Sequence, residues 1–181
     1  MTSFPIAPTR PKEIVQHGQT RIDNYFWMRF REDPEVLKYL HAEQDYLEEV
    51  MQHTKPLQEQ IFQEMKGRIK EDDASAPEQD GEYIYYTRYE AGKQYPFYCR
   101  KKASLESVEE ILVDQNLLAG ENNFCRIGSF AVSPDTNKLA YSVDSDGTEV
   151  CTLYIKDLAT GELLPDVITN TFGDVYAHAG V

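Results

Sequence analysis

The sequence is short of cysteines and of metal-ligating patterns. Its 181 residues include three cysteines, with no Cys-x-x-Cys pair, so the sequence indicates neither a disulfide framework nor a zinc site. We expect Cys99, Cys125 and Cys151 to be buried thiols in strands. The histidines show no ligand spacing such as i and i+4 on a helix; they are His17, His41, His53 and His178. We therefore predict no metal site and no cofactor.

Positive charge is also scarce, with 18 Lys and Arg against 31 Asp and Glu and a formal net charge of −13. Binding of nucleic acid or an anionic membrane requires clustered cations, so both partners are excluded. No apolar run reaches the length of a membrane helix, and the N-terminus lacks the apolar segment of a secretory signal. We therefore expect a cytoplasmic location.

Residues 129–168 contain the clearest pattern, four short strands joined by three turns. Residues 133–137 (SPDTN) and 157–161 (DLATG) are turns, and side chains alternate from Leu139 onward as a half-buried strand requires. Asp146-Gly147 predicts a two-residue hairpin turn. Pro165 cannot donate to a strand ladder, so the fourth strand suits a sheet edge. A four-strand meander is typical of a propeller blade, although it also fits sandwiches and barrels.

A second copy of this pattern lies 55 residues upstream. The offset pairs Tyr86 with Tyr141, Gly92 with Gly147 and Lys101 with Lys156. Two copies favour a propeller or another repeat array, in which each unit buries its faces against its neighbours. Residues 115–124 are expected to be a loop between the copies. Residues 174–178 would open a third copy.

The N-terminal third predicts an extended arm and two helices. Three prolines keep residues 1–13 extended, and Trp27 should anchor this arm. Asp33 is a predicted N-cap, with Pro34 at the first position of a helix ending near residue 52. Thr54 should cap a second helix, antiparallel to the first, that ends at Gly67. Apolar residues form a stripe on each helix, which we expect to pack as core against a further domain.

These features predict three regions. Residues 1–73 form the arm and helices, residues 74–81 form a polar linker, and residues 82–181 form two blades and the start of a third. The predicted fold is mainly β with an N-terminal α-helical segment, namely the first blades of a β-propeller preceded by an extended arm and two antiparallel helices. A propeller needs several blades to close, so these residues cannot complete one.

Several segments resemble the prolyl oligopeptidase family of serine peptidases, and within it the oligopeptidase B group. They are residues 17–29 (HGQTRIDNYFWMR), 33–43, 64–73 (EMKGRIKEDD), 95–100 and 133–161. The resemblance implies a seven-bladed propeller that gates access of short peptides, cleaved after Arg or Lys, to a C-terminal α/β-hydrolase domain. Phe30 departs from the acidic residue common there, and residues 176–181 depart from the third-blade pattern, as in a truncated or interrupted gene product.

The resemblance implies a Ser-His-Asp triad outside these residues. The sequence has no Gly-x-Ser-x-Gly motif, and Ser129 after Gly128 lacks the second glycine, so we read it as a sheet residue. We predict no catalytic residue here and no activity of the chain alone. The alternative is a non-catalytic propeller-type binding module that pairs with another chain through open strand edges. In either case we expect the exposed edges and stripes to drive self-association.

Overall fold

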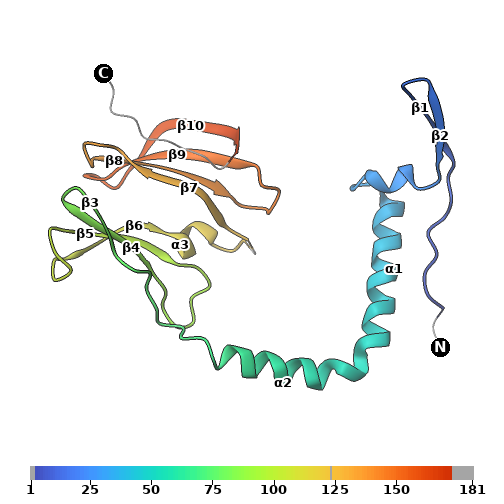
Figure 1. The fold of residues 1–181 in the computed structure, drawn as a ribbon, viewed down its shortest axis with the longest axis horizontal. Helices are drawn as coiled ribbons and strands as arrows, with labels where there is room; N and C mark the ends of the chain where they lie inside the picture. The colour runs from blue at the N-terminus through green and yellow to red at the C-terminus, as the bar shows by residue number, and fades with distance from the viewer. Residues whose placement is uncertain (1–2, 123, 173–181) are drawn as a thin grey trace. The chain divides into compact units, whose positions relative to one another are not determined.

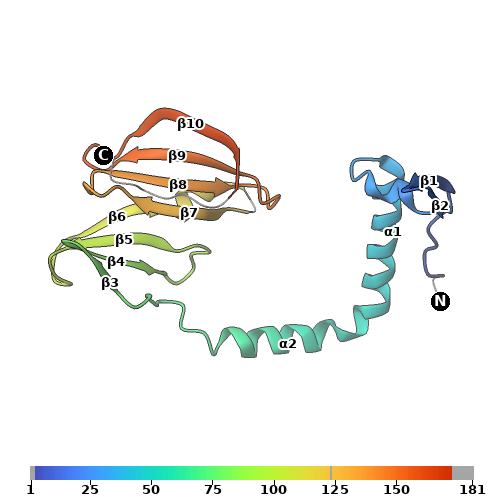
Figure 2. The ribbon, with the colours of Figure 1, turned by 45° about the horizontal axis from the view of Figure 1, so that its top comes forward.

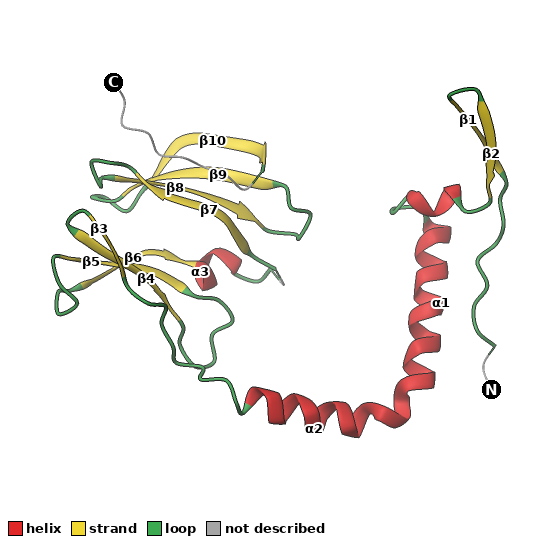
Figure 3. Cartoon of the chain, in the orientation of Figure 1, coloured by secondary structure: helices red, strands yellow, loops and turns green. Residues whose placement is uncertain are grey.

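The computed structural model describes residues 3–122 and 124–172 of the chain. These residues belong to two compact units, Met1–Ile69 and Lys70–Val181. The first contains the two long helices and a small hairpin, and the second consists mainly of strands, as the colours of Figure 3 show. The predicted start of a third blade at residues 174–178 and the departure at 176–181 lie outside the described residues.

The first unit begins with an arm that leads into an unpredicted β-hairpin. Strands β1 (Lys12–Gln16) and β2 (Gln19–Asp23) pair antiparallel, with Gln16 opposite Gln19. His17 and Gly18 form the turn with φ values of 53° and 75°, which is the left-handed conformation that a two-residue hairpin of type I′ requires at both positions. The sequence analysis missed these strands because their side chains do not alternate cleanly between apolar and polar.

Trp27 fixes the arm to the segment that follows the hairpin. It lies in a 3-10 turn, Phe26–Arg29, and is buried. Its indole Nε1 donates to the carbonyl of Pro8 at 3.0 Å, and the Arg10 guanidinium lies 4.7 Å from the ring centroid. The prediction that Trp27 anchors the arm is confirmed.

Helix α1 (Pro34–Met51) starts where the sequence predicts. The Asp33 side chain accepts a hydrogen bond from the backbone N–H of Glu35 at 2.8 Å, and Pro34 occupies the first turn. A 3-10 turn, Gln52–Thr54, connects it to α2 (Lys55–Lys66), and Gly67 ends α2 as predicted. Together these segments form a helical stretch of 33 residues.

The prediction that the two helices are antiparallel is wrong. The backbone from Met51 to Lys55 remains in right-handed helical conformation, so the chain bends but does not reverse. Figures 1 and 2 show α2 leading away from the end of α1. Thr54 does not cap α2, because its hydroxyl donates back to the carbonyl of Met51 at 2.7 Å. Pro56 lacks an N–H for the helical ladder, which is a common cause of such a bend.

The second unit holds two four-stranded antiparallel sheets, each a meander of consecutive strands. We call them blade 1 and blade 2, and Figure 2 shows the two sets of strands. Blade 1 comprises β3 (Glu78–Asp80), β4 (Tyr83–Arg88), β5 (Phe97–Lys102) and β6 (Glu109–Asp114). Blade 2 comprises β7 (Arg126–Val132), β8 (Lys138–Asp144), β9 (Cys151–Asp157) and β10 (Leu163–Thr171). Pro165 lies in β10, an edge strand as predicted.

The blades confirm the 55-residue repeat. Tyr86 and Tyr141 lie in the second strands, β4 and β8, and Lys101 and Lys156 lie in the third strands, β5 and β9. The predicted linker 74–81 is in part a strand, because β3 pairs with β4. Ala74 also bridges to Arg88. Short polar segments such as EQD carry no apolar alternation, so the pattern gave no sign of β3.

The core of the second unit lies between the two sheets. Leu112, Val113, Leu139 and Tyr141 are buried there, and partly buried aromatic rings pack around them. Tyr98 of blade 1 stacks on Phe130 of blade 2, with ring centroids 5.1 Å apart. Each blade therefore buries one face against the other, as repeat architectures require. The three cysteines are free and buried, as predicted, with Cys99 in β5, Cys151 in β9 and Cys125 just before β7.

Two connections differ from the prediction. Residues 115–119 form a short helix, α3 (Gln115–Ala119), where we expected a loop, and the Asp114 side chain caps it. The Asp146-Gly147 segment is not a two-residue turn, because the ladder between β8 and β9 ends at Val143 and Thr152. The wider loop is organised by Asp144, which is fully buried. Its carboxylate accepts the N–H groups of Asp146, Gly147 and Glu149 at 3.2, 2.8 and 3.0 Å.

Replacing the helix cap tests the start of α1. Asp33→Ala should lower the free energy of unfolding of the first unit by about 1 kcal/mol, the usual cost of losing a side-chain N-cap. Asp33→Asn should retain most of the stability, because its amide oxygen still accepts the bond. Urea unfolding followed by Trp27 fluorescence measures the difference, since Trp27 is the only tryptophan and lies in this unit. Equal losses in both variants would contradict the cap.

Replacing Asp144 tests the loop between β8 and β9. Burial raises the pKa of Asp144, but the three backbone hydrogen bonds lower it by more, so its pKa lies below the ordinary value. Its contribution is therefore present above the unfolded pKa of about 4 and is lost as pH falls through the lower folded value. Asp144→Asn should destabilise blade 2 by about 1–3 kcal/mol at neutral pH, because it weakens buried hydrogen bonds.

Hydrogen exchange at the amides of residues 146–149 measures this loss directly. The difference between wild type and Asp144→Asn should shrink below about pH 4. Glu149→Gln is the matched control, because the Glu149 side chain lies in the same loop, is exposed and makes no hydrogen bond with the described residues. A difference that persists at pH 2, or an equal effect of the control, would contradict the role given to Asp144.

Candidate functional site

Ser129 is a strand residue, as predicted. It lies in β7, where its backbone N–H donates to the Ser142 hydroxyl and the two hydroxyl oxygens are 2.9 Å apart. Both serines therefore bond across the ladder between β7 and β8. The prediction that the chain carries no catalytic residue remains a prediction.

A surface formed by the two helices is the most distinctive feature of the first unit. Its large apolar side chains, 38–62% exposed, line up at helical spacing along the 33-residue stretch. We call it the helical apolar surface; it consists of Leu40, Leu47, Val50, Met51, Leu57, Ile61, Phe62 and Met65. The sequence analysis expects this stripe to pack against a further domain, which stays a prediction. Within the described part of the first unit, only Val36 and Trp27 are buried hydrophobic residues.

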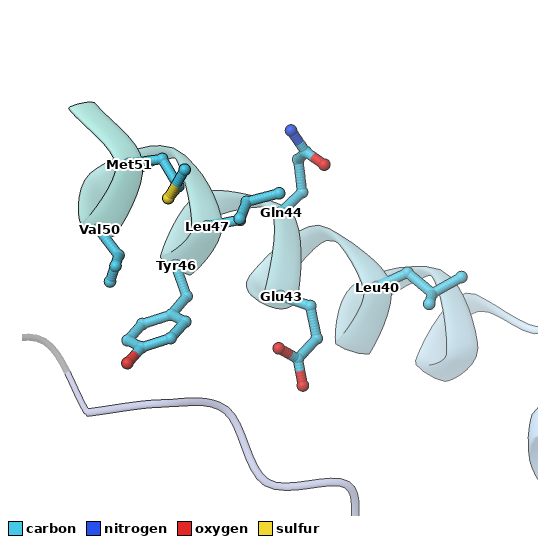
Figure 4. A pocket seen from close by; sticks show the side chains of 7 residues that line it. All are labelled: Leu40, Glu43, Gln44, Tyr46, Leu47, Val50 and Met51. Carbon is cyan, nitrogen blue, oxygen red and sulfur yellow. The ribbon is translucent and has the colours of Figure 1, made fainter. Parts of the chain in front are cut away.

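A shallow hollow of about 550 Å³ lies on α1 within this surface. Figure 4 shows the side chains that line it, with the apolar groups of Leu40, Leu47 and Met51 projecting from the helix and Glu43 and Tyr46 on its other side. Large exposed apolar areas on otherwise polar proteins mark interaction sites. Full burial of each such side chain would contribute roughly 1.5–3 kcal/mol.

In the second unit, Arg100 connects the two blades. Its side chain is 5% exposed and binds the Glu110 carboxylate, with a shortest distance of 2.7 Å. It also donates to the carbonyl of Thr136 in the β7–β8 turn at 3.0 Å and lies 4.1 Å from the ring centroid of Tyr83. Burial alone would lower the pKa of Arg100, but the hydrogen bond with Glu110 raises it above the ordinary value. Arg100 therefore carries a full charge that Glu110 neutralises.

A second ion pair occupies the opposite face of blade 1. Arg88 binds Glu109 at 2.9 Å, and the Tyr86 hydroxyl donates to the same carboxylate at 2.5 Å. Burial raises the pKa of Glu109, but the hydrogen bonds from Arg88 and Tyr86 lower it below the ordinary value overall. Burial also raises the pKa of the neighbouring Cys99 thiol to about 11. Cys99 therefore stays protonated at neutral pH and is a poor nucleophile.

Sequence reasoning did not single out Arg88, Arg100 or Asp144. The available signal was a charged residue at an inward position of a strand otherwise rich in aromatics, as with Arg100 after Tyr98 and Cys99. Such a charge requires a partner when buried, and the register places Glu110 directly opposite Arg100. Predicting this register from the sequence would have required knowledge of the bulge between Tyr98 and Cys99, which no residue pattern indicates.

Residues 3–122 and 124–172 contain no group of three or more His, Cys, Asp or Glu side chains arranged to hold a metal ion. No helix in this described part combines the length and apolar composition needed to cross a bilayer.

Comparison with known proteins places this geometry in a family. Residues 5–176 match the family model described as the prolyl oligopeptidase N-terminal β-propeller domain. The chain is 38% identical over 174 residues to Protease 2 of Moraxella lacunata, covering 93% of this chain and 25% of that protein. It is 39% identical over 195 residues to dipeptidyl aminopeptidase BI of Pseudoxanthomonas mexicana, covering 94% of this chain and 27% of that protein.

Solved structures agree with this assignment. Oligopeptidase B from Leishmania major superposes with a TM-score of 0.88 at 31% identity, over 95% of this chain and 27% of that one. Oligopeptidase B from Trypanosoma brucei, in a closed form with covalently bound antipain, gives 0.88 at 35% identity, over 98% and 28%. The chain thus spans about a quarter of the length of the relatives it matches. It belongs to the prolyl oligopeptidase family, within the part that forms the N-terminal β-propeller domain.

Proposed function

We propose that this chain is the N-terminal region of an oligopeptidase B-like serine peptidase that hydrolyses short peptides after Arg or Lys. In this proposal the blades gate access of the substrate, and the arm and helices support a C-terminal α/β-hydrolase domain. The catalytic triad lies outside these 181 residues, so the chain alone is inactive. The enzyme works in the cytoplasm.

The observation that carries the proposal is the helical apolar surface in a chain so similar to oligopeptidase B. Its eight apolar side chains have the exposure of an interface that lacks its partner, and exposed apolar patches of this kind mark contact sites. About three quarters of the length of these relatives lies outside the part that this chain matches. A hydrolase domain in that remaining length would supply the apolar cover.

Two rival functions follow from particular observations. The relative named dipeptidyl aminopeptidase BI raises the alternative that dipeptides are released from a free N-terminus. The open sheet edges β3, β6, β7 and β10 favour a non-catalytic binding module that pairs with another chain by strand addition. Each alternative predicts a different outcome in an assay of cleavage.

The assay compares the 181-residue chain with the product of the same locus read through past codon 181. The substrates are an N-blocked Arg-Arg fluorogenic amide, its Ala-Ala counterpart, and an Arg-Arg amide with a free N-terminus. We expect the longer product to cleave the blocked Arg-Arg amide far faster than the Ala-Ala amide, and the short chain to cleave neither.

Preference for the free N-terminus would favour the dipeptidyl aminopeptidase alternative. Lack of cleavage by both products would favour the binding module. Cleavage by the short chain, surviving rigorous purification, would contradict the assignment of catalysis to other residues.

Charged substitutions in the helical apolar surface test its role. Leu47→Asp with Ile61→Asp should reduce self-association of the 181-residue chain, measured by sedimentation velocity, because a charge opposes burial of the surface. The same pair should lower the thermal stability of the longer product. Ala42→Asp with Gln60→Asp is the matched control, since it adds the same charge at exposed positions of the same helices that do not belong to the surface. Equal association in both variants would contradict an apolar interface here.

A further inference from the structure

A cavity of about 250 Å³ lies between blade 1 and blade 2. It is lined by Glu78 of β3, by Tyr85 and Thr87 of β4, by Tyr98 of β5 and by Phe130 of β7. The cavity therefore joins the first strands of both blades. All of these residues belong to the second unit, so the walls of the cavity are fixed by the packing of the two sheets. Ligand pockets for drug-sized molecules measure roughly 300–1,000 Å³, so this cavity suits one side chain.

The walls are aromatic. Tyr98 and Phe130 stack with an interplanar angle of 20° and a centroid separation of 5.1 Å, and both pack against the core together with Tyr85. The faces of aromatic rings attract cations through their quadrupole, most strongly where water is excluded. Blade 1 already uses this attraction, for example with Arg88 over Phe97 and Arg100 over Tyr83. The aromatic walls favour a cationic guest over an anionic one.

The charge at the cavity is negative and uncompensated. The two arginines of blade 1 do not line the cavity, and each is neutralised by its own glutamate, Arg88 by Glu109 and Arg100 by Glu110. The Glu78 side chain is exposed, and its carboxylate has no hydrogen bond or ion pair with any described residue. The Ser75 hydroxyl in the same lining is already engaged, because it accepts the N–H of Thr87 at 3.0 Å. Glu78 is thus the free carboxylate among these groups.

We propose that this cavity binds a cationic side chain, Arg or Lys, of a peptide substrate. Glu78 pairs with the charged end, and the rings of Tyr98 and Phe130 hold the aliphatic stem. The inference rests on the proposed function for its ligand class, a peptide rich in basic residues. It places a recognition point for basic side chains between the first two blades.

The test measures binding without catalysis. Acetyl-arginine methylamide is titrated into the ¹⁵N-labelled 181-residue chain, and the amide shifts of Glu78, Tyr85 and Thr87 are followed. Acetyl-citrulline methylamide has the same shape without the charge and is the ligand control. We expect saturable shifts with the arginine compound only. An equal response to citrulline, or no saturable shift, would overturn the proposal.

Two variants of Glu78 and one of Asp80 locate the binding. Glu78→Gln should weaken binding about fivefold, the value of an exposed ion pair near 1 kcal/mol, and Glu78→Lys should abolish it. Asp80→Asn is the matched control, because Asp80 is an exposed carboxylate of the same strand that does not line the cavity. Equal losses in Glu78→Gln and Asp80→Asn would show general attraction to an acidic surface and overturn the site.

The outcome separates this inference from the proposed function. If the longer product cleaves the Arg-Arg amide but the short chain shows no saturable binding, the proposal of a binding cavity is overturned and the proposed peptidase function is supported. If binding is saturable and depends on Glu78 but the longer product does not cleave the amide, the binding cavity is supported and the proposed peptidase function is contradicted.

Discussion

The whole structure depends on one constraint, that every sheet face and every apolar helix stripe must be covered. In blade 2, the central strand β8 has Leu139, Tyr141 and Ser142 buried, so both faces of that strand are shielded from water. Blade 1 covers one face of blade 2 through the hydrophobic cluster around Leu112 and Leu139. The described residues of the first unit give the helical apolar surface no such cover. A repeat architecture distributes stability over neighbour contacts, and the described part of this chain contains one contact between blades.

Polar groups fix the geometry that apolar packing alone leaves loose. A buried charge is costly unless it is paired, and both arginines on blade 1 meet this requirement within their own sheet. Arg100 additionally reaches the Thr136 carbonyl of blade 2, and Lys156 of blade 2 donates to the Leu112 carbonyl of blade 1 at 2.9 Å. These directional bonds set the register between the blades. The two arginines of blade 1 are thus compensated within their own sheet.

Much of the fold was accessible from sequence, because alternation and turn residues are local signals. The 55-residue offset identified the second and third strands of both blades, and Asp33-Pro34 located the start of α1. The errors arose where tertiary contacts decide. The expected two-residue Asp-Gly turn is a wider loop in the structure, because the buried Asp144 carboxylate binds the N–H groups of that loop. The helices failed to fold back because residues 51–55 stay helical, which the Thr54-Pro56 pattern does not exclude. The pairing of Glu110 with Arg100 required a strand register that includes a bulge.

We propose that the helical apolar surface is an interface for a domain outside these residues. Hydroxyl-radical footprinting of Met51 and Met65 tests it directly, because both thioethers lie in this surface and are exposed. In the 181-residue chain, studied at a concentration where it is monomeric, both methionines should be oxidised readily. In the product read through past codon 181 both should be strongly protected. Equal oxidation of the two methionines in both products would contradict the claim.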